Sequence, residues 1–323
     1  MAGGDRAFAA DSLYGTTDDD AYSGAMSFLR RRYTRDLAGA DVVVSGIAYD
    51  LATTNRPGAR FGPRALRQAS THIAWGPQWP WDFDPFHRLA VIDWGDHAFY
   101  HGHVEEMLEK VEANTAAFLG AGCWPMTMGG DHFVALPLLR AQARHHGGGL
   151  SLVHFDAHRD SHPTERYSHG TMFHHAAKEG LIDPARSIHL GIRTHDDHDD
   201  GFETIDGWAC QRMTAREIAE RIRARVGDNK AYLTFDIDFL DPSQAPGTGT
   251  PVAGGPTTTT ALDVLMRLKG VDLVGMDLVE VAPDYDVGEI TALAGASVLY
   301  QVIHLLAAER SNIADLDAAP TAG

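Results

Sequence analysis

The chain has few cysteines, no long run of purely apolar residues and no excess of basic side chains. Only Cys123 and Cys210 occur among its 323 residues. Two cysteines cannot make a disulfide framework, and they fit a reducing compartment. No apolar stretch approaches the roughly 20 residues that span a bilayer, so we expect no membrane segment. Residues 1–20 lack a basic flank that leads into an apolar core. We therefore expect a flexible lead-in over residues 1–30, no signal peptide and a cytoplasmic location.

The charge balance is acidic. The chain carries 44 Asp and Glu against 27 Lys and Arg, for a formal net charge of −17. An acidic chain without a basic stripe does not favour nucleic acid or an anionic membrane as a partner. A small cationic substrate would be attracted to it.

Short apolar runs rich in β-branched residues alternate with longer amphipathic segments. We expect strands at residues 41–49, 89–92, 125–128, 150–155, 187–192, 231–235 and 271–281. We expect a helix to begin at residue 62, and further helices at 103–119, 133–140, 215–226, 262–268 and 290–306. This alternation predicts a three-layer α/β/α fold with a central, mostly parallel sheet. One α/β domain over residues 31–323 accounts for the whole pattern.

Three clusters of metal-ligand side chains each follow an expected strand. They are Gly-Gly-Asp-His at 129–132, Asp-Ala-His-Arg-Asp at 156–160 and Asp-Ile-Asp at 236–238. In open α/β sheets the ligand site lies beyond the carboxyl ends of the strands, so the clusters should meet there. Alone, a histidine after Gly-Gly is more often a loop or capping residue, and Asp-x-Asp is more often a turn. The cluster at 156–160 is different, because burying three ionisable groups is costly unless they are paired or bind a cation.

Together the clusters supply enough ligands for a two-metal site, which can make a nucleophile from water at neutral pH. Carboxylate-rich ligation with some imidazole suits Mn²⁺ better than an ion that prefers thiolates. The candidate metal ligands are His132, Asp156, His158, Asp160, Asp236 and Asp238.

These clusters also carry a family resemblance. Together with the run DIDFLDPSQAPGTGTPVAGG at 236–255, they resemble the ureohydrolase family of arginases and agmatinases, and bacterial agmatinases in particular. The resemblance covers about residues 40 to 307. Further matching segments are NRPGARFGP at 55–63, SHGTMFHHAAKEG at 168–180 and GMDLVEVAP at 275–283.

The resemblance implies an arginase-like fold with two Mn²⁺ ions per subunit. Asp156 and Asp236 would bridge both ions. One coordination sphere would be completed by His132 and Asp160, and the other by His158 and Asp238. A metal-bridging hydroxide would attack the guanidinium carbon of agmatine and give urea and putrescine. The family also commonly forms trimers or hexamers, so we expect a homo-oligomer.

The resemblance further implies two catalytic residues. Glu280 would hold the substrate guanidinium, and His169 would act as a proton shuttle or position the substrate. The chemistry is sound, because a carboxylate pairs bidentately with guanidinium and a histidine can protonate a leaving amine near neutral pH. Without the family, Glu280 would more often be a strand-end surface residue and His169 a loop histidine.

Two arginines depart from the agmatinase pattern and keep an alternative open. Arg159 lies inside Asp-x-His-x-Asp, and Arg166 lies in the segment before His169. An arginine would repel the cationic amine of agmatine but would welcome the carboxylate of 4-guanidinobutanoate or 3-guanidinopropanoate. A non-catalytic relative that acts as a scaffold would usually have lost metal ligands. A two-metal phosphoesterase lacks an evident basic phosphate clamp here.

Other conspicuous residues receive structural interpretations. The acidic run HDDHDD at 195–200 predicts a solvated loop. The segment at 56–63 predicts a shaped loop before a helix, with a structural or site-wall role. Both cysteines should be packing residues. We expect four tryptophans to pack the fold or a subunit interface, namely Trp75, Trp79, Trp81 and Trp94.

Overall fold

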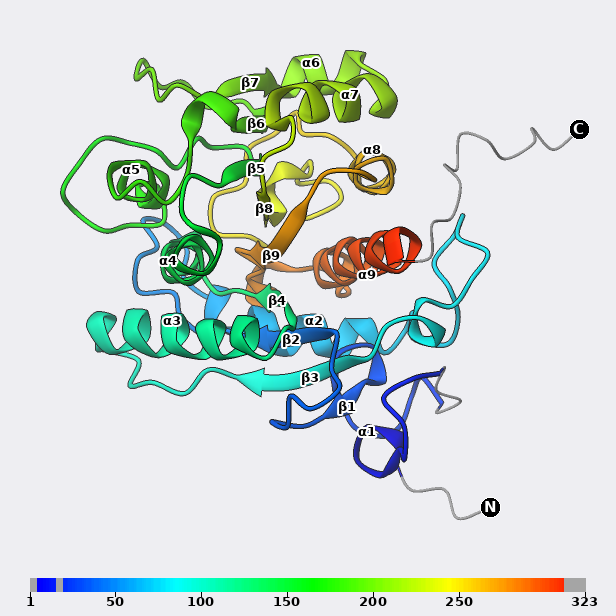
Figure 1. Cartoon of the computed structure of the whole chain (residues 1–323). Coiled ribbons are helices and arrows are strands. Elements are labelled where there is room, and N and C mark those ends of the chain that lie inside the picture. The colour runs from blue at the N-terminus through cyan, green and yellow to red at the C-terminus, as the bar shows by residue number, and fades with distance from the viewer. Residues whose placement is uncertain (1–4, 16–19, 311–323) are drawn as a thin grey trace, which may run out of the picture.

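A computed structural model describes residues 5–15 and 20–310. Within them, nine strands form one sheet in the order β1-β3-β2-β4-β9-β8-β5-β6-β7 (Figure 1). Every neighbouring pair is parallel. The strands are β1 Arg32–Tyr33, β2 Val42–Gly46, β3 Val91–Asp96, β4 Trp124–Met128, β5 Ser151–Phe155, β6 Ile188–Ile192, β7 Glu203–Asp206, β8 Ala231–Asp236 and β9 Leu273–Val279.

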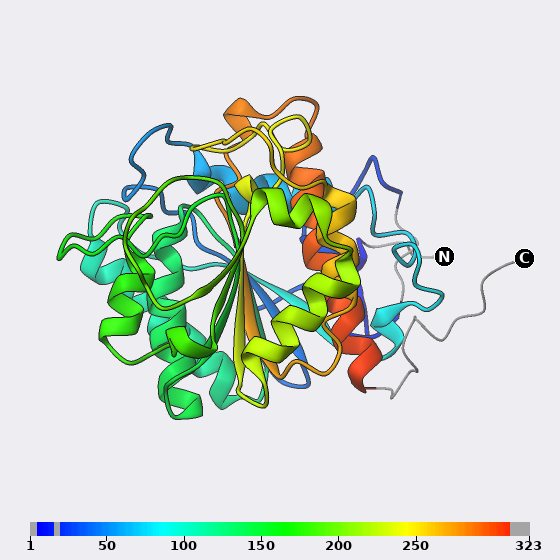
Figure 2. The ribbon, with the colours of Figure 1, turned by 90° about the horizontal axis from the view of Figure 1, so that it is seen from above.

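Helices cover both faces of this sheet. The α-helices are α1 Arg6–Ala9, α2 Gly62–Ser70, α3 Val104–Gly120, α4 Ala135–His146, α5 Met172–Lys178, α6 Gly207–Arg212, α7 Ala215–Val226, α8 Thr258–Met266 and α9 Ile290–Arg310. Short 3₁₀ turns are η1 Phe28–Arg30, η2 Ala59–Phe61, η3 Pro85–His87, η4 His132–Val134, η5 Pro184–Arg186, η6 Ile237–Phe239 and η7 Pro283–Tyr285. Figure 2 shows the strands between α3, α4 and α5 on one side and α7, α8 and α9 on the other. The three-layer prediction is confirmed.

The central strands are buried along their whole length, because helices cover both of their faces. All five residues of β5 and all seven of β9 are buried. This explains why their sequences are nearly continuous apolar runs rather than alternating ones. One apolar core lies between the sheet and α2, α7, α8 and α9, and a second lies between the sheet and α3, α4 and α5.

The helix ends follow local chemistry. Helix α7 begins at a capping box, in which the Thr214 side chain accepts from the backbone N–H of Glu217 and the Glu217 side chain accepts from that of Thr214. Helix α4 ends at Gly147, whose φ of 96° is left-handed. The sequence predicted the bounds of α7 correctly. It missed β1, β7, α5 and α6, which are short or polar and give little periodic signal.

The described part of the lead-in packs onto the domain at its end. Phe28 and Leu29 are fully buried in the core on the α2 and α9 side. The boundary at residue 31 stays a prediction. Among the tryptophans, Trp81 and Trp94 are buried, whereas Trp75 and Trp79 are 76% and 88% exposed.

Helix α9 corrects one expectation. It is long and apolar enough to cross a membrane, with a mean hydropathy of 1.7 in its most apolar window. The expectation that no apolar stretch approaches this length is therefore wrong. However, 78% of that window is buried inside the domain, and α9 packs against α2 and α8. An all-round apolar helix of this kind is a core helix.

A buried ion pair ties α2 to the sheet. The guanidinium of Arg67 donates to both carboxylate oxygens of Asp93, at 2.8 and 3.0 Å, and the Asp93 side chain is fully buried. Asp93 also accepts from the backbone N–H groups of Phe28 and Gly95. The carboxylate thus fastens the residue 28 segment, α2 and β3 at one point.

We expect Arg67→Ala to lower the free energy of unfolding by about 3–5 kcal/mol, because Asp93 would keep a buried charge without its cation. The measurement is chemical denaturation at pH 7. Arg144→Ala is the matched control, since Arg144 pairs with Glu112 but its side chain is 71% exposed. That change should cost about 0–1 kcal/mol. Equal losses in the two variants would contradict the role given to Asp93.

Candidate metal centre

The predicted ligands converge at the carboxyl ends of four adjacent strands. In the sheet order, β4, β9, β8 and β5 are consecutive. His132 follows β4, Asp156 follows β5, Asp236 ends β8, and Glu280 follows β9. The close turn after β4 depends on glycine, since a Cβ at Gly130 would lie 1.6 Å from the Tyr49 carbonyl oxygen. Parallel topology thereby brings together residues that are up to about 150 positions apart.

One group of ligands surrounds the imidazole of His132. Its Nδ1 atom lies 3.1 Å from Asp156, 2.9 Å from Asp160 and 3.3 Å from Asp236. The ring is fully buried, and Nδ1 makes no hydrogen bond of acceptable geometry in the described structure. A buried nitrogen that faces three carboxylate oxygens without a hydrogen bond is placed as a metal ligand would be.

The other nitrogen of His132 explains this orientation. Nε2 lies 2.8 Å from the hydroxyl of Thr234, which itself donates to Asp277 at 2.6 Å. Because the Thr234 hydrogen points to Asp277, the Thr234 oxygen accepts from Nε2–H of His132. Asp277 also accepts from the Tyr232 hydroxyl at 2.9 Å. Burial lowers the pKa of this ring, but its contacts with the carboxylates raise it well above the usual value when no cation is bound. In the neutral form that binds a metal, the hydrogen lies on Nε2 and the lone pair on Nδ1, toward the carboxylates.

A second group lies on the other side of Asp156. The Nδ1 atom of His158 lies 3.3 Å from Asp156 and 3.1 Å from Asp238. Backbone N–H groups orient the carboxylates: that of His158 donates to Asp156, that of Asp238 to Asp236, and that of Ala157 to Asp238. Asp156 thus contacts both groups, and the structure brings all six predicted ligands together.

The carboxylates repel one another. Burial raises the pKa of Asp160 to about 6, and the neighbouring charge of Asp156 adds to the rise. Burial and the charge of Asp238 likewise raise the pKa of Asp236. A cation at the centre would remove this penalty, and oxygen with imidazole nitrogen is the donor set of Mn²⁺-type ions. The residues present therefore fit divalent cations.

Two of the site residues have left-handed backbone conformations. The φ angles of Asp160 and Glu280 are 54° and 64°. A residue other than glycine rarely adopts this region, at a cost of roughly 1–3 kcal/mol, and such strain gathers at functional sites.

Glu280 and His169 lie beside the metal cluster. The Oε1 atom of Glu280 accepts from the backbone N–H of His132 at 2.9 Å and lies 2.7 Å from Nδ1 of His169. The Oε2 atom of Glu280 is buried and has no partner in the described structure. It faces Gly249, where a Cβ would lie 3.6 Å from Oε2. Glu280 therefore offers an unpaired carboxylate oxygen next to the cluster.

The ring of His169 lies between two opposing influences. Burial lowers its pKa, but Glu280 outweighs burial and raises it. On the other side, the backbone N–H of Thr54 points at Nε2 at 3.0 Å and favours the neutral ring, while the Thr54 hydroxyl lies 2.7 Å from Nε2 and can accept a hydrogen bond from the protonated ring. The balance raises the pKa of His169 to about 9, so at neutral pH the ring holds a proton that it can donate.

The sequence interpretation missed His154. This residue is fully buried in β5, and its Nε2 lies 2.7 Å from Asp156. It belongs with His132, Asp156 and Asp160 to a group whose ligand atoms lie within 4.8 Å of one another. Its signal was available, because alternation along a strand places His154 on the same face as Asp156.

The prediction of a solvated loop at residues 195–200 is only partly correct. The Asp200 side chain is only 4% exposed and accepts from Ser161 at 2.6 Å, so the prediction of a solvated loop is wrong for this residue. Arg159 points to Asp200, at 3.4 Å from both of its oxygens. Arg166 is exposed. The side chain of Arg56 donates to the Gly249 carbonyl and stacks on Tyr285, as expected of a site wall.

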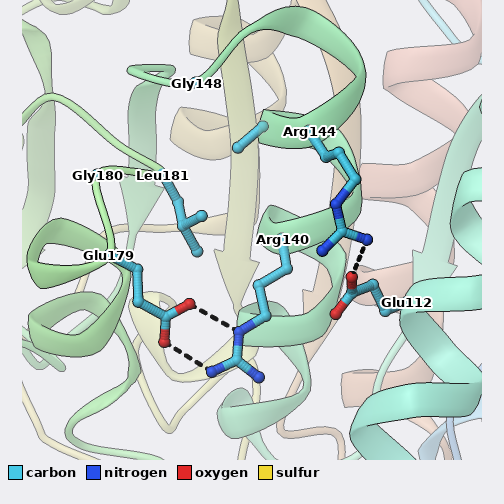
Figure 3. Close-up of a pocket in the computed structure, with 8 residues that line it drawn as sticks. Glu112, Arg140, Arg144, Gly148, Glu179, Gly180 and Leu181 are labelled. Atoms are coloured by element: carbon cyan, nitrogen blue, oxygen red, sulfur yellow. Dashed lines mark hydrogen bonds and ion pairs between the residues drawn. The ribbon is translucent and has the colours of Figure 1, made fainter.

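Both cysteines are buried packing residues, as expected, and burial raises the pKa of each thiol. A separate surface pocket of about 630 Å³ lies where α3, α4 and the end of α5 meet (Figure 3). Its four charged side chains are paired as Arg140 with Glu179 and Arg144 with Glu112. None of the six predicted metal ligands lines it.

Comparisons with known proteins agree with this geometry. The model of the Arginase family matches residues 40–305. The chain belongs to the arginase family. An agmatinase from Proteus mirabilis is 48% identical over 306 residues, which are 93% of this chain and 99% of that protein. A crystal structure of a hypothetical agmatinase from Burkholderia thailandensis has a TM-score of 0.94 and 48% identity, covering 95% of this chain and 99% of that one. A proclavaminate amidino hydrolase from Streptomyces clavuligerus has a TM-score of 0.83 and 34% identity, covering 90% and 100%.

The cation dependence of this arginase-family chain can be tested by thermal unfolding. Asp160 has a raised pKa of about 6 in the folded, metal-free protein, against 3.8 when unfolded. Its contribution to stability is thus present below pH 3.8 and is lost as the pH rises through about 6. We expect Mn²⁺ at 100 times its Kd to stabilise the chelated protein by about 2.7 kcal/mol at pH 8.

The same addition at pH 6 should stabilise the protein less, because protons compete with the cation for the carboxylates. Comparing samples with and without Mn²⁺ at each pH cancels the titration of other groups. An equal shift in melting temperature at both values, or none at pH 8, would contradict the fit of the cluster to cations.

Proposed function

We propose that this protein is an agmatinase, which hydrolyses agmatine to urea and putrescine. One observation carries the proposal: the buried, unpaired Oε2 of Glu280 lies beside a cluster of six potential metal ligands. A permanently protonated guanidinium would supply the missing partner. The similarity to agmatinases over nearly the whole chain supports the same substrate.

The cofactor we propose is a pair of Mn²⁺ ions in each subunit. His132, Asp160, Asp156 and Asp236 would hold one ion, and Asp156, Asp236, His158 and Asp238 the other. When bound, the two ions supply a nucleophile from water at neutral pH. The chain's own contribution is to hold these side chains in place through Thr234, Asp277 and the backbone N–H groups described above.

The roles of Glu280 and His169 follow from their contacts. Glu280 Oε2 binds and orients the guanidinium, while Oε1 stays fixed by His132 and His169. His169 holds a proton through its contact with Glu280 and would pass it to the leaving amine. A scaffold without activity is disfavoured, because every candidate ligand is present and oriented.

The substrate tail is the point at which the alternatives differ. A guanidino acid would need a free cation to receive its carboxylate, and Arg159 is already paired with Asp200. Arg166 is exposed on the segment before His169. No contact in the described structure favours the guanidino acids, and the net charge of −17 favours a cationic tail.

The proposal is tested by urea release from Mn²⁺-loaded protein with agmatine, arginine, 4-guanidinobutanoate, 3-guanidinopropanoate and free guanidine. We expect kcat/KM to be highest for agmatine, because its tail is cationic and Arg159, which could receive a carboxylate, is paired with Asp200. Faster turnover of a guanidino acid would reject agmatinase activity in favour of the alternative. Absence of urea from all five would reject both.

Glu280→Gln should lower kcat/KM for agmatine by roughly 30-fold or more, which is about 2 kcal/mol. The amide can still accept at one oxygen, but it no longer carries the charge that pairs with guanidinium. The matched control is Asp284→Asn, an exposed carboxylate four residues further along the chain. Full activity of Glu280→Gln with bound metal would remove Glu280 from the proposed mechanism.

Two expectations remain predictions. The first is that the protein forms a homo-oligomer, a trimer or hexamer by resemblance. Trp79, which we expected to pack the fold or a subunit interface, borders a small surface pocket that Pro80 and Leu262 also line. The second is a cytoplasmic location.

A further inference from the structure

Asp200 stands at the centre of a buried polar network that reaches the metal cluster by two routes. Its carboxylate lies 3.1 Å from Nε2 of His189, 2.6 Å from the Ser161 hydroxyl and 3.4 Å from the guanidinium of Arg159. The loop that carries Asp200 is acidic and largely exposed, and Asp200 alone among its carboxylates makes these contacts within the described structure. It is therefore built into the site rather than left in solvent.

The first route runs through two histidines. Nδ1 of His189 lies 2.7 Å from Nδ1 of His154, and Nε2 of His154 lies 2.7 Å from Oδ2 of Asp156. Both rings are fully buried. His189 and His154 are directly paired in register on β6 and β5, so the sheet itself fixes their distance. The ring of Phe202 stacks on that of His189, with 4.1 Å between the ring centroids. The ring of Phe173 contacts that of His154 edge-on, with 4.8 Å between the centroids.

The second route runs through the backbone beside Asp160. Arg159 and Ser161 flank this ligand on both sides, and both bind Asp200. Asp160 has a left-handed φ of 54°, a conformation that surrounding contacts must hold in place. By fixing the residues before and after it, Asp200 opposes relaxation of that strained backbone.

We propose that Asp200 is a positioning residue for the metal centre, orienting Asp156 through His189 and His154 and holding the Asp160 backbone through Arg159 and Ser161. The inference rests on the proposed binuclear site. It gives a function to one residue of an otherwise largely exposed acidic loop. It also explains why Arg159 is tolerated between two proposed metal ligands. Asp200 does not touch the substrate.

The decisive variant is Asp200→Asn. The asparagine oxygen can still accept from the backbone N–H of Phe202, which Asp200 binds at 3.0 Å, so the loop keeps this contact. Its NH₂ group then takes the place of the carboxylate oxygen that lies 3.1 Å from Nε2 of His189, so the histidine pair loses the negative charge at its outer end. The matched control is Asp197→Asn in the same loop, which makes the same change of charge at a side chain that is 93% exposed.

The first readout is Mn²⁺ affinity, measured from the electron paramagnetic resonance signal of free Mn²⁺ during titration. Loss of a partner behind a metal ligand costs about 10–100-fold in affinity or activity. We expect Asp200→Asn to bind Mn²⁺ about 10–100-fold more weakly, and Asp197→Asn to bind like the parent protein. Equal affinities for the two variants would overturn the proposal.

The second readout is turnover at saturating Mn²⁺. We expect kcat to fall in Asp200→Asn while KM for agmatine stays within about twofold, because Asp200 does not meet the substrate. Metal binding is measured without any substrate. If the protein did not hydrolyse agmatine, the proposed function would be rejected, but the Mn²⁺ affinities of the two variants would still test the role of Asp200.

Ser161→Ala keeps the inference testable if Asp200→Asn does not fold. It removes one hydroxyl that links Asp200 to the Asp160 backbone, and it should weaken Mn²⁺ binding by several-fold with an unchanged melting temperature of the metal-free protein. Unchanged Mn²⁺ affinity in a folded Ser161→Ala would overturn the second route. A fall in melting temperature alone in either variant, with affinity intact, would reduce Asp200 to a stabilising contact.

Discussion

Mutual repulsion among buried carboxylates is the constraint around which this site is built. Asp156, Asp160, Asp236 and Asp238 are all buried or nearly so, and burial with neighbouring charge raises the pKa of three of them. The fourth, Asp156, also meets burial, yet its histidine contacts lower its pKa. Asp156 is thus the ionised centre of the cluster, and it is the carboxylate that both groups of ligands share. Such a cluster is stable only with cations or with histidines at its edge.

The fold meets this constraint with a row of polar side chains across the sheet, directly beneath the ligands. The register pairs Thr127 with Asp277, Asp277 with Thr234, Thr234 with His154 and His154 with His189. Every member is buried. Because successive side chains on a strand alternate, Thr234 and His154 share a face with Asp236 and Asp156, two residues later. The row therefore orients ligands from below, and parallel pairing makes it continuous over five strands.

The sequence predicted the layers, the central strands and the six ligands, since long apolar runs and strand-end clusters are strong local signals. Its helix at residues 215–226 coincides with α7, where the structure shows a capping box at Thr214 and a buried apolar face. It could not identify the edge strand β7, which is short and polar, or helix α5, which has only seven residues. His154 was overlooked inside the run LSLVHF, where one histidine looks like a tolerated exception. Asp200 could not be found at all, because nothing in HDDHDD distinguishes its one buried carboxylate from the half-buried and exposed carboxylates beside it. Only the tertiary structure brings Ser161 and His189 to it.

Arg159 shows why a single charged residue in the sequence is a poor guide to substrate specificity. From the sequence, an arginine between two metal ligands resembles a receptor for a carboxylate. In the structure its neighbours, His158 and Asp160, face the cluster, while Arg159 pairs with Asp200 on the other side. The cation and the anion therefore neutralise each other. What remains next to the ligands is the unpaired oxygen of Glu280, and a negative oxygen selects for a cation. On our proposal, one carboxylate matches the site to a guanidinium, and the arginine that suggested a different substrate would instead help to hold the ligands in place.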